Sequence, residues 1–267
     1  MMDQLSQWLP SVLDVATEAA KAGAEQLKKY WRNISNLRQK SFSSDLVTEA
    51  DEKSEQAILK VLTHYFSTHH ILSEEAGANE ISSSFSWVID PLDGTTNYAH
   101  HYPVFAISIG LLYQGQPILG VIYHPIAEEM FTAYQGGGAY LNGEKIKVSK
   151  TKELDKSLLA TGFAYDRASR EDNNYAEFSH LTNLTHGVRR GGSAALDLAY
   201  VACGRLDGYW ESGIKIWDIA AGVALIQEAG GKVSDYDLSA LDYYSGRILA
   251  SNSLLQKRLS ESLFNKN

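Results

Sequence analysis

A short apolar run that ends in two closely spaced carboxylates constrains this chain more than any other stretch. Residues 87–98 read Trp-Val-Ile-Asp-Pro-Leu-Asp-Gly-Thr-Thr-Asn-Tyr. The run Trp87–Ile89 is β-branched or aromatic and is bounded by a proline two positions later, which is typical of a buried strand. Gly94 and the two threonines after it suit the start of a helix, whose first N–H groups have no partner within the helix. Asp90 and Asp93 beside such a helix start would suit divalent cations and a phosphate together. The same stretch also reads as a strand, a turn and a helix cap without chemistry.

Composition excludes several classes of protein. The chain has 267 residues, which is enough for one large domain or two closely packed ones, and its hydrophobic fraction of 44% is that of an ordinary soluble protein. The net charge of −8 argues against nucleic acid as a primary partner, because phosphate backbones favour clustered Lys and Arg. The single cysteine, Cys203, allows no internal disulfide and fits a reducing compartment. We find neither a secretory signal pattern nor a long apolar run, so we expect a cytoplasmic protein that does not span a membrane.

The first part of the chain, residues 1–150, predicts two helices followed by an antiparallel sheet. Apolar residues at helical spacing predict an amphipathic helix over Leu5–Trp31. Its regular part is expected to begin at Pro10, because proline suits the first turn of a helix. Thr48 and Asp51 have the form of a capping box, so a second helix begins there. Strands joined by hairpin turns are expected at 105–113, 118–123 and 130–134 and around Asn142-Gly143.

The second part of the chain, residues 151–267, predicts a smaller α/β half. Short apolar strands alternate there with helices, and an apolar helix begins at Trp217-Asp218. We find no linker between the two parts. The expected architecture is therefore an α+β half followed by a largely α/β half, within one compact body.

Four acids are expected at strand or helix ends: Glu74, Asp90, Asp93 and Asp218. Asp218 would also be explained by the helix dipole, which favours an acid at a helix start. No paired histidines or cysteines accompany these acids, so an all-oxygen site would favour Mg²⁺, Mn²⁺ or Ca²⁺ over zinc. Four carboxylates in close contact would repel one another unless cations neutralised them. If the four acids meet in space, they predict a metal site.

Two motifs carry a resemblance to a known family. Asp90-Pro-Leu-Asp-Gly-Thr-Thr-Asn97 and Trp217-Asp-Ile-Ala-Ala-Gly222 resemble the diagnostic motifs of the inositol monophosphatase family of Mg²⁺-dependent, lithium-sensitive phosphatases. Further blocks follow the family order: Asp45 to Asp51, Ser73-Glu74-Glu75, Gly191-Gly192-Ser193-Ala194 and Tyr209-Trp210-Glu211. The resemblance implies the layered α/β sandwich of the sugar phosphatase fold, which is shared with fructose-1,6-bisphosphatases. It also implies one compact catalytic unit that assembles as a homodimer. Most metal ligands would then lie in residues 1–150.

The resemblance also implies roles for individual residues in the hydrolysis of inositol monophosphate by metal-activated water. Two to three Mg²⁺ ions, with Mn²⁺ as a substitute, would be held by Glu74, Asp90, the carbonyl of Leu92, Asp93 and Asp218. Asp45 and Thr95 would orient the attacking water and take its proton. The substrate, a small phosphorylated polyol, would contact Asp93, Gly94, Thr95, Gly192, Ser193, Ala194, Glu211 and Asp218.

Several alternatives remain open at this point. Another branch of the family would cleave fructose 1,6-bisphosphate, 3′-phosphoadenosine 5′-phosphate or histidinol phosphate, and a binding protein would retain the fold without the chemistry. The chain departs from the animal inositol enzymes at Gly162-Phe163-Ala164-Tyr165: those enzymes carry small residues there, whereas many bacterial and plastid relatives carry an aromatic residue. This departure argues against strict specificity for inositol. Arg167 and Arg189-Arg190 would either serve a second phosphate or lie on the surface or at a subunit contact.

Overall fold

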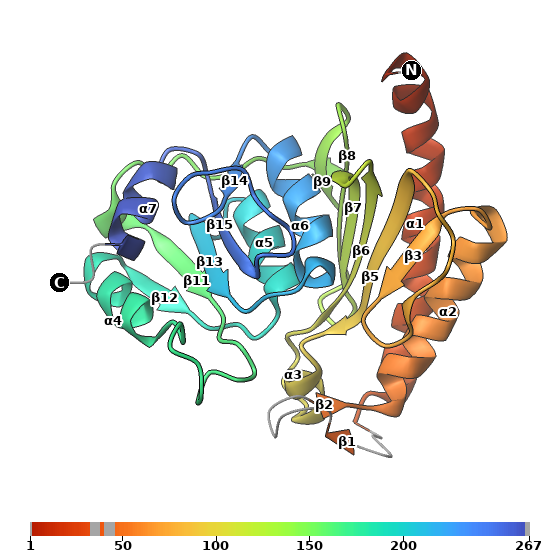
Figure 1. The fold of residues 1–267 in the computed structure, drawn as a ribbon, viewed down its shortest axis with the longest axis horizontal. Helices are drawn as coiled ribbons and strands as arrows, with labels where there is room; N and C mark the ends of the chain where they lie inside the picture. The colour runs from red at the N-terminus through yellow and green to blue at the C-terminus, as the bar shows by residue number, and fades with distance from the viewer. Residues whose placement is uncertain (1, 33–37, 40–45, 265–267) are drawn as a thin grey trace.

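Five alternating layers of helices and strands make up the molecule (Figure 1). The computed structural model describes residues 2–32, 38–39 and 46–264. The helices within these residues are α1 (Met2–Tyr30), α2 (Glu49–Tyr65), α3 (Thr95–Ala99), α4 (Tyr175–Leu184), α5 (Ala194–Ala202), α6 (Ile216–Glu228) and α7 (Gln256–Phe264), with a short 3₁₀ turn, η1 (Leu154–Lys156).

The larger sheet has eight strands in the order β10-β9-β8-β7-β6-β5-β3-β4. Its strands are β3 (His70–Ser73), β4 (Gly77–Ala78), β5 (Phe85–Asp93), β6 (Ala106–Tyr113), β7 (Gln116–His124), β8 (Glu129–Tyr134), β9 (Gly138–Leu141) and β10 (Glu144–Lys145). All neighbours pair antiparallel except β3 and β5, which are parallel. The hairpins expected between residues 105 and 148 are therefore confirmed.

The smaller sheet has five strands in the order β12-β11-β13-β15-β14. Its strands are β11 (Leu158–Thr161), β12 (Gly187–Arg189), β13 (Gly208–Ser212), β14 (Lys232–Ser234) and β15 (Arg247–Ser251). Strand β11 pairs parallel with β12 and β13, whereas β15 pairs antiparallel with β13 and β14. A separate two-stranded ribbon pairs β1 (Arg38–Gln39) with β2 (Leu46–Val47). The division expected near Lys150 falls between the last strand of the larger sheet and the first strand of the smaller one.

The layers explain why the opening apolar run is continuous rather than alternating. Helices α1 and α2 cover one face of the larger sheet, and α5 and α6 lie between the two sheets (Figure 1). Trp87 and Ile89 belong to the hydrophobic cluster shared with α1 and α2, whereas Val88 belongs to the central cluster around α5 and α6. A strand buried on both faces needs apolar residues at successive positions. The layered α/β fold predicted from the sequence is confirmed.

Two local features of the first helices test the predictions further. The capping box at Thr48 and Asp51 is present at the start of α2, as expected. Helix α1, however, begins at Met2, so Pro10 lies inside it rather than in its first turn. Proline removes one N–H from the helix, and Pro10 is exposed, so the carbonyl group of the preceding turn can be hydrated.

Candidate active site

Strand β5 continues through Pro91 to Asp93 rather than ending in a turn at Asp90. Its pairing with β6 shifts along the way: Asp90 lies opposite Ser108, whereas Asp93 lies opposite Ala106. Two residues of β5, Pro91 and Leu92, therefore lie opposite the single residue Ile107 of β6, which defines a bulge. Residues three apart on a regular strand face opposite sides of the sheet. Because the bulge adds one residue to β5 between them, the side chains of Asp90 and Asp93 face the same side of the sheet.

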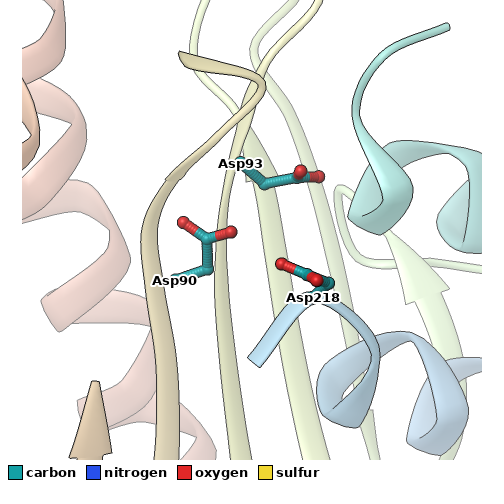
Figure 2. A group of neighbouring side chains, drawn as sticks. All are labelled: Asp90, Asp93 and Asp218. Carbon is teal, nitrogen blue, oxygen red and sulfur yellow. The ribbon is translucent and has the colours of Figure 1, made fainter. Parts of the chain in front are cut away.

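The third carboxylate of the cluster comes from the start of α6. Oxygen atoms of Asp90, Asp93 and Asp218 all lie within 4.8 Å of one another (Figure 2). The Lys215 N–H donates to Oδ2 of Asp218 at 2.8 Å, which holds that side chain at the helix start. The Ser108 hydroxyl donates to the Trp217 carbonyl at 3.1 Å and ties α6 to the larger sheet. Residues more than a hundred positions apart thus form one acidic cluster.

The cluster is electrostatically strained in the absence of counterions. Burial, and then the charges of Glu74 and Asp93, raise the pKa of Asp90 well above its ordinary value. Burial, followed by the charges of Asp93 and Glu74, likewise raises the pKa of Asp218. Burial raises the pKa of Asp93 to about 6, although hydrogen bonds oppose the shift. Repulsion of this kind is relieved either by protons or by bound cations.

Asp93 also connects the larger sheet to helix α5. Its Oδ2 atom accepts from the Ser193 hydroxyl at 2.6 Å and from the Ala195 N–H at 2.7 Å, both at the start of α5. The Asn97 amide donates to the Gly191 carbonyl at 2.9 Å, just before that helix. The predicted segment 191–194 therefore meets the opening stretch, as the substrate assignments require.

A cavity of about 270 Å³ lies over the cluster. Every predicted site residue in the described part of the chain lines it: Glu74, Asp90, Leu92, Asp93, Gly94, Thr95, Gly192, Ser193, Ala194, Glu211 and Asp218. Asp45, the other predicted site residue, lies outside the described residues. Glu74 borders the cavity but does not belong to the tight group of three carboxylates.

The carboxylate that contacts Thr95 within the described chain is that of Asp51. Thr95 Oγ1 lies 3.0 Å from Asp51 Oδ1, and burial raises the pKa of Asp51 to about 6. The other Asp51 oxygen accepts from the N–H and hydroxyl groups of Thr48. Sequence reasoning interpreted Asp51 only as the acid of the capping box. Nothing in the local pattern signals its second contact, because Thr95 is 44 positions away.

The opposite wall of the cavity is built around Glu211 on β13. The Tyr209 hydroxyl donates to the Glu211 carboxylate, and burial raises the pKa of Glu211 to about 7. A Cβ atom on Gly162 would lie 2.1 Å from Glu211 Oε2, so a side chain at position 162 would displace the Glu211 carboxylate. Tyr165, from the segment in which the chain departs from the animal enzymes, also lines the cavity, as does Asp197, which the sequence pattern does not single out. Burial raises the pKa of Asp197 well above its ordinary value.

The three arginines considered for a second phosphate differ in whether they line a pocket. Arg190 lines the main cavity and also a neighbouring pocket of about 220 Å³. Arg167, Phe163 and Tyr175 line that second pocket too. Arg189 is exposed and lines neither of them.

Comparisons with known proteins identify one family of relatives. A model of the inositol monophosphatase family matches residues 8–266. An inositol-1-monophosphatase of Synechocystis sp. is 52% identical over 96% of this chain and 89% of its own length. The structure of inositol monophosphatase from Anabaena (Nostoc) sp. PCC 7120 is 54% identical, with a TM-score of 0.89 over 96% of both chains. The Nus factor SuhB of Pseudomonas aeruginosa is 43% identical over 93% of this chain and 94% of its own length.

Among the described residues, no helix has both the length and the apolar character that crossing a membrane requires.

Proposed function

Because this chain belongs to the inositol monophosphatase family, we propose that it hydrolyses inositol monophosphate to inositol and phosphate with Mg²⁺ as the cofactor. The observation that carries the proposal is the meeting of Asp90, Asp93 and Asp218 within 4.8 Å of one another. The same cavity is lined by Thr95, whose hydroxyl contacts Asp51, and by Glu211, whose carboxylate can accept hydrogen bonds from a polyol.

The donor set of the cavity fits Mg²⁺. Its charged donors are carboxylates, and the described residues that line it include no histidine or cysteine. Glu74, Asp90, Asp93 and Asp218, with the Leu92 carbonyl, would hold the ions. When bound, such ions neutralise the carboxylates, activate a water molecule and stabilise the charge that develops on phosphate and leaving group.

Thr95 and Asp51 suit the task of orienting the attacking water and removing its proton. The Thr95 hydroxyl can donate to Asp51 and accept a hydrogen bond from water with its lone pairs. A buried carboxylate with a pKa of about 6 is a stronger base than an exposed aspartate. We therefore propose that Asp51 shares this role with Asp45, the residue that the family resemblance implies, and keep Thr95 as their partner.

The start of α3 suits the phosphate group. The first N–H groups of a helix lack intrahelical acceptors and attract anions, and the N–H groups of Gly94 and Thr95 lie at this position. Gly94 has a φ angle of 99°, and a Cβ atom there would lie 3.0 Å from the Val104 carbonyl oxygen. The proposed phosphate contact therefore depends on glycine at position 94.

The remaining contacts concern the alcohol part of the substrate. Carboxylates accept hydrogen bonds from neighbouring hydroxyl groups, so Glu211, Asp93 and Asp218 suit a polyol. Ser193 and Gly192 shape the same wall, together with the Ala194 N–H. Family membership also supports a homodimer, which sedimentation of the purified protein would test.

The deciding experiment compares phosphate release from a panel of esters in the presence of Mg²⁺. We expect inositol 1-phosphate to be turned over faster than 3′-phosphoadenosine 5′-phosphate, histidinol phosphate and fructose 1,6-bisphosphate. Faster turnover of the nucleotide would overturn the assigned substrate. Absence of Mg²⁺-dependent release from every ester would indicate a binding protein instead.

A further inference from the structure

Helix α2 presents three buried polar side chains to the active site. Asp51, Ser54 and Glu55 are spaced three and four positions apart, which places them on one face of the helix. Each is less than a tenth exposed: 1% for Asp51, 0% for Ser54 and 6% for Glu55. Buried polar groups destabilise a fold unless they are hydrogen-bonded, so their partners indicate why they are there.

The partners are three different segments of the active site. Asp51 contacts Thr95 at the start of α3. The Ser54 hydroxyl donates to the carbonyl of Pro91, inside the bulge of β5, at 2.8 Å. Glu55 contacts the short connection between β3 and β4. The proposed function accounts for the Asp51 contact and the bulge for the Ser54 contact, whereas neither accounts for the Glu55 contact.

Three donors converge on one oxygen atom of Glu55. Oε1 accepts from the Ala76 N–H at 3.0 Å, from the Glu75 N–H at 3.2 Å and from the Ser73 hydroxyl. These donors come from the residue before Glu74 and from the two residues after it. Hydrogen bonds from N–H groups to an ionised carboxylate are roughly twice as strong as neutral ones. Glu55 therefore holds the chain on both sides of Glu74.

The connection is short and borders the cavity. Strands β3 and β4 pair with Ser73 opposite Gly77, which leaves only residues 74–76 between them. The N–H of Glu74 donates to the Ile89 carbonyl at 3.1 Å, next to Asp90. Glu74 lines the cavity with the three aspartates, whose charges repel its own. Without an anchor, this repulsion would favour a connection displaced from the cluster.

We propose that Glu55 is a positioning residue of the cation site, whose carboxylate holds residues 73–76 so that Glu74 stays beside Asp90. The role rests on the proposed function, since it requires that the cavity binds divalent cations. Glu55 itself contacts neither the cation nor the substrate. Its removal acts through the geometry of Glu74.

The test uses Glu55→Ala and Glu55→Gln in the full chain, with Glu52→Gln as a matched control. Glu52 lies on the same helix, but its side chain is 43% exposed and pairs with Arg38 on the surface. Mn²⁺ binding is measured from the EPR signal of the free ion, and turnover is measured as a function of Mg²⁺ concentration. We expect Glu55→Ala to weaken Mn²⁺ binding and raise the half-saturating Mg²⁺ concentration by about 10–100-fold. Turnover at saturating Mg²⁺ should recover to within a few-fold of wild type.

Glu55→Gln distinguishes this role from a general contribution to folding. Glutamine keeps an oxygen that can accept the three hydrogen bonds but loses the charge, so its Mn²⁺ affinity should lie between those of the wild type and Glu55→Ala. If Glu55→Ala does not fold, Glu55→Gln carries the test alone. A purely structural residue would lower the unfolding temperature without changing the Mg²⁺ dependence.

Mn²⁺ affinity within twofold of wild type in the folded Glu55 variants would overturn the proposal. The same holds if Glu52→Gln weakens binding as much as Glu55→Gln does. A wild-type protein that neither binds Mn²⁺ nor releases phosphate would instead refute the cation site itself, and with it the proposed function.

Discussion

Thr95 Oγ1 lies 3.0 Å from Asp51 Oδ1 and equally far, 3.0 Å, from the carbonyl oxygen of Leu92. The threonine hydroxyl carries a single proton, so these two acceptors compete for it. Asp51 is held in place by Thr48, whose N–H donates to its other oxygen at 2.9 Å. The same aspartate thus caps α2 and contacts the site, and substitutions can separate the two roles.

Asp51→Asn should lower kcat by at least about 100-fold and leave KM nearly unchanged, because an amide cannot take a proton from Thr95. Steady-state kinetics with inositol 1-phosphate would measure both constants. Thr48→Ala is the control: it removes the helix cap, so it should lower the free energy of unfolding by about 0.5–2 kcal/mol with a much smaller loss of kcat. Equal kcat losses in the two variants would show that Asp51 acts only as a cap.

Thr95→Ala should lower kcat about as much as Asp51→Asn, because residues that act as one unit lose their effect together. The double variant is then expected to be no slower than the slower single variant. Kinetics of the four proteins in this cycle provide the test. Losses that multiply in the double variant would contradict a shared role.

Asp93→Asn should nearly abolish turnover while the fold is retained. The asparagine oxygen can still accept from Ser193 and Ala195, but the charge that faces the cation site is lost. We expect a loss greater than about 100-fold, above the range seen for residues that only support a metal ligand. Turnover and circular dichroism together check this, and near wild-type turnover in a folded variant would refute the metal assignment.

Mg²⁺ should stabilise the protein more at pH 8 than at pH 5. Burial raises the folded-state pKa of Asp93 to about 6 and those of Asp90 and Asp218 well above their ordinary values. Because the folded state then binds more protons than the unfolded one, the metal-free protein loses stability as the pH rises from about 4 through these values. At pH 8, Mg²⁺ at about a hundred times its Kd should raise the unfolding temperature by about 5–10 °C.

Calorimetric scans with and without Mg²⁺ at the two pH values check this prediction. In Asp93→Asn the pH dependence of the metal-free protein should flatten, because one of the coupled carboxylates is gone. A Mg²⁺-induced rise in unfolding temperature that is larger at pH 5 than at pH 8 would contradict proton release from the buried carboxylates as its cause.

Gly162→Ala should impair substrate binding more than metal binding. The new Cβ atom would lie 2.1 Å from Glu211 Oε2, so the carboxylate must move away from the cavity. Crowding of this kind lowers the free energy of unfolding by about 1–3 kcal/mol, and we expect KM to rise about tenfold, equivalent to about 1.4 kcal/mol. An unchanged KM together with a raised half-saturating Mg²⁺ concentration would indicate that Glu211 affects metal binding rather than substrate binding.

Lithium should inhibit turnover at millimolar concentrations. A monovalent ion that replaces Mg²⁺ beside Asp218 supplies less charge to the developing transition state. Inhibition assays at several Mg²⁺ concentrations would measure the effect. Insensitivity to lithium would contradict the proposal that Mg²⁺ binds beside Asp218.

Local patterns in the chain were sufficient to predict the helices, the hairpins and the division into an α+β and an α/β half, whereas the family resemblance implied the layered sandwich. The capping box of Thr48 and Asp51 depends on residues three apart, and the continuous apolar run from Trp87 to Ile89 reports a strand buried on both faces. Patterns of this kind are encoded by near neighbours, so they are visible without coordinates. The position of Pro10 inside α1 was missed, because exposure of the helix face decides whether proline is tolerated there.

Contacts between distant segments were decided only by the tertiary structure. The bulge between Asp90 and Asp93 turns both acids to one side because of the register with β6. The partners of Asp51 and Glu55 lie on α3 and between β3 and β4. The sequence identifies which residues carry oxygen ligands, but register and packing decide which of those oxygens meet, because both depend on the sum of many contacts across the whole core.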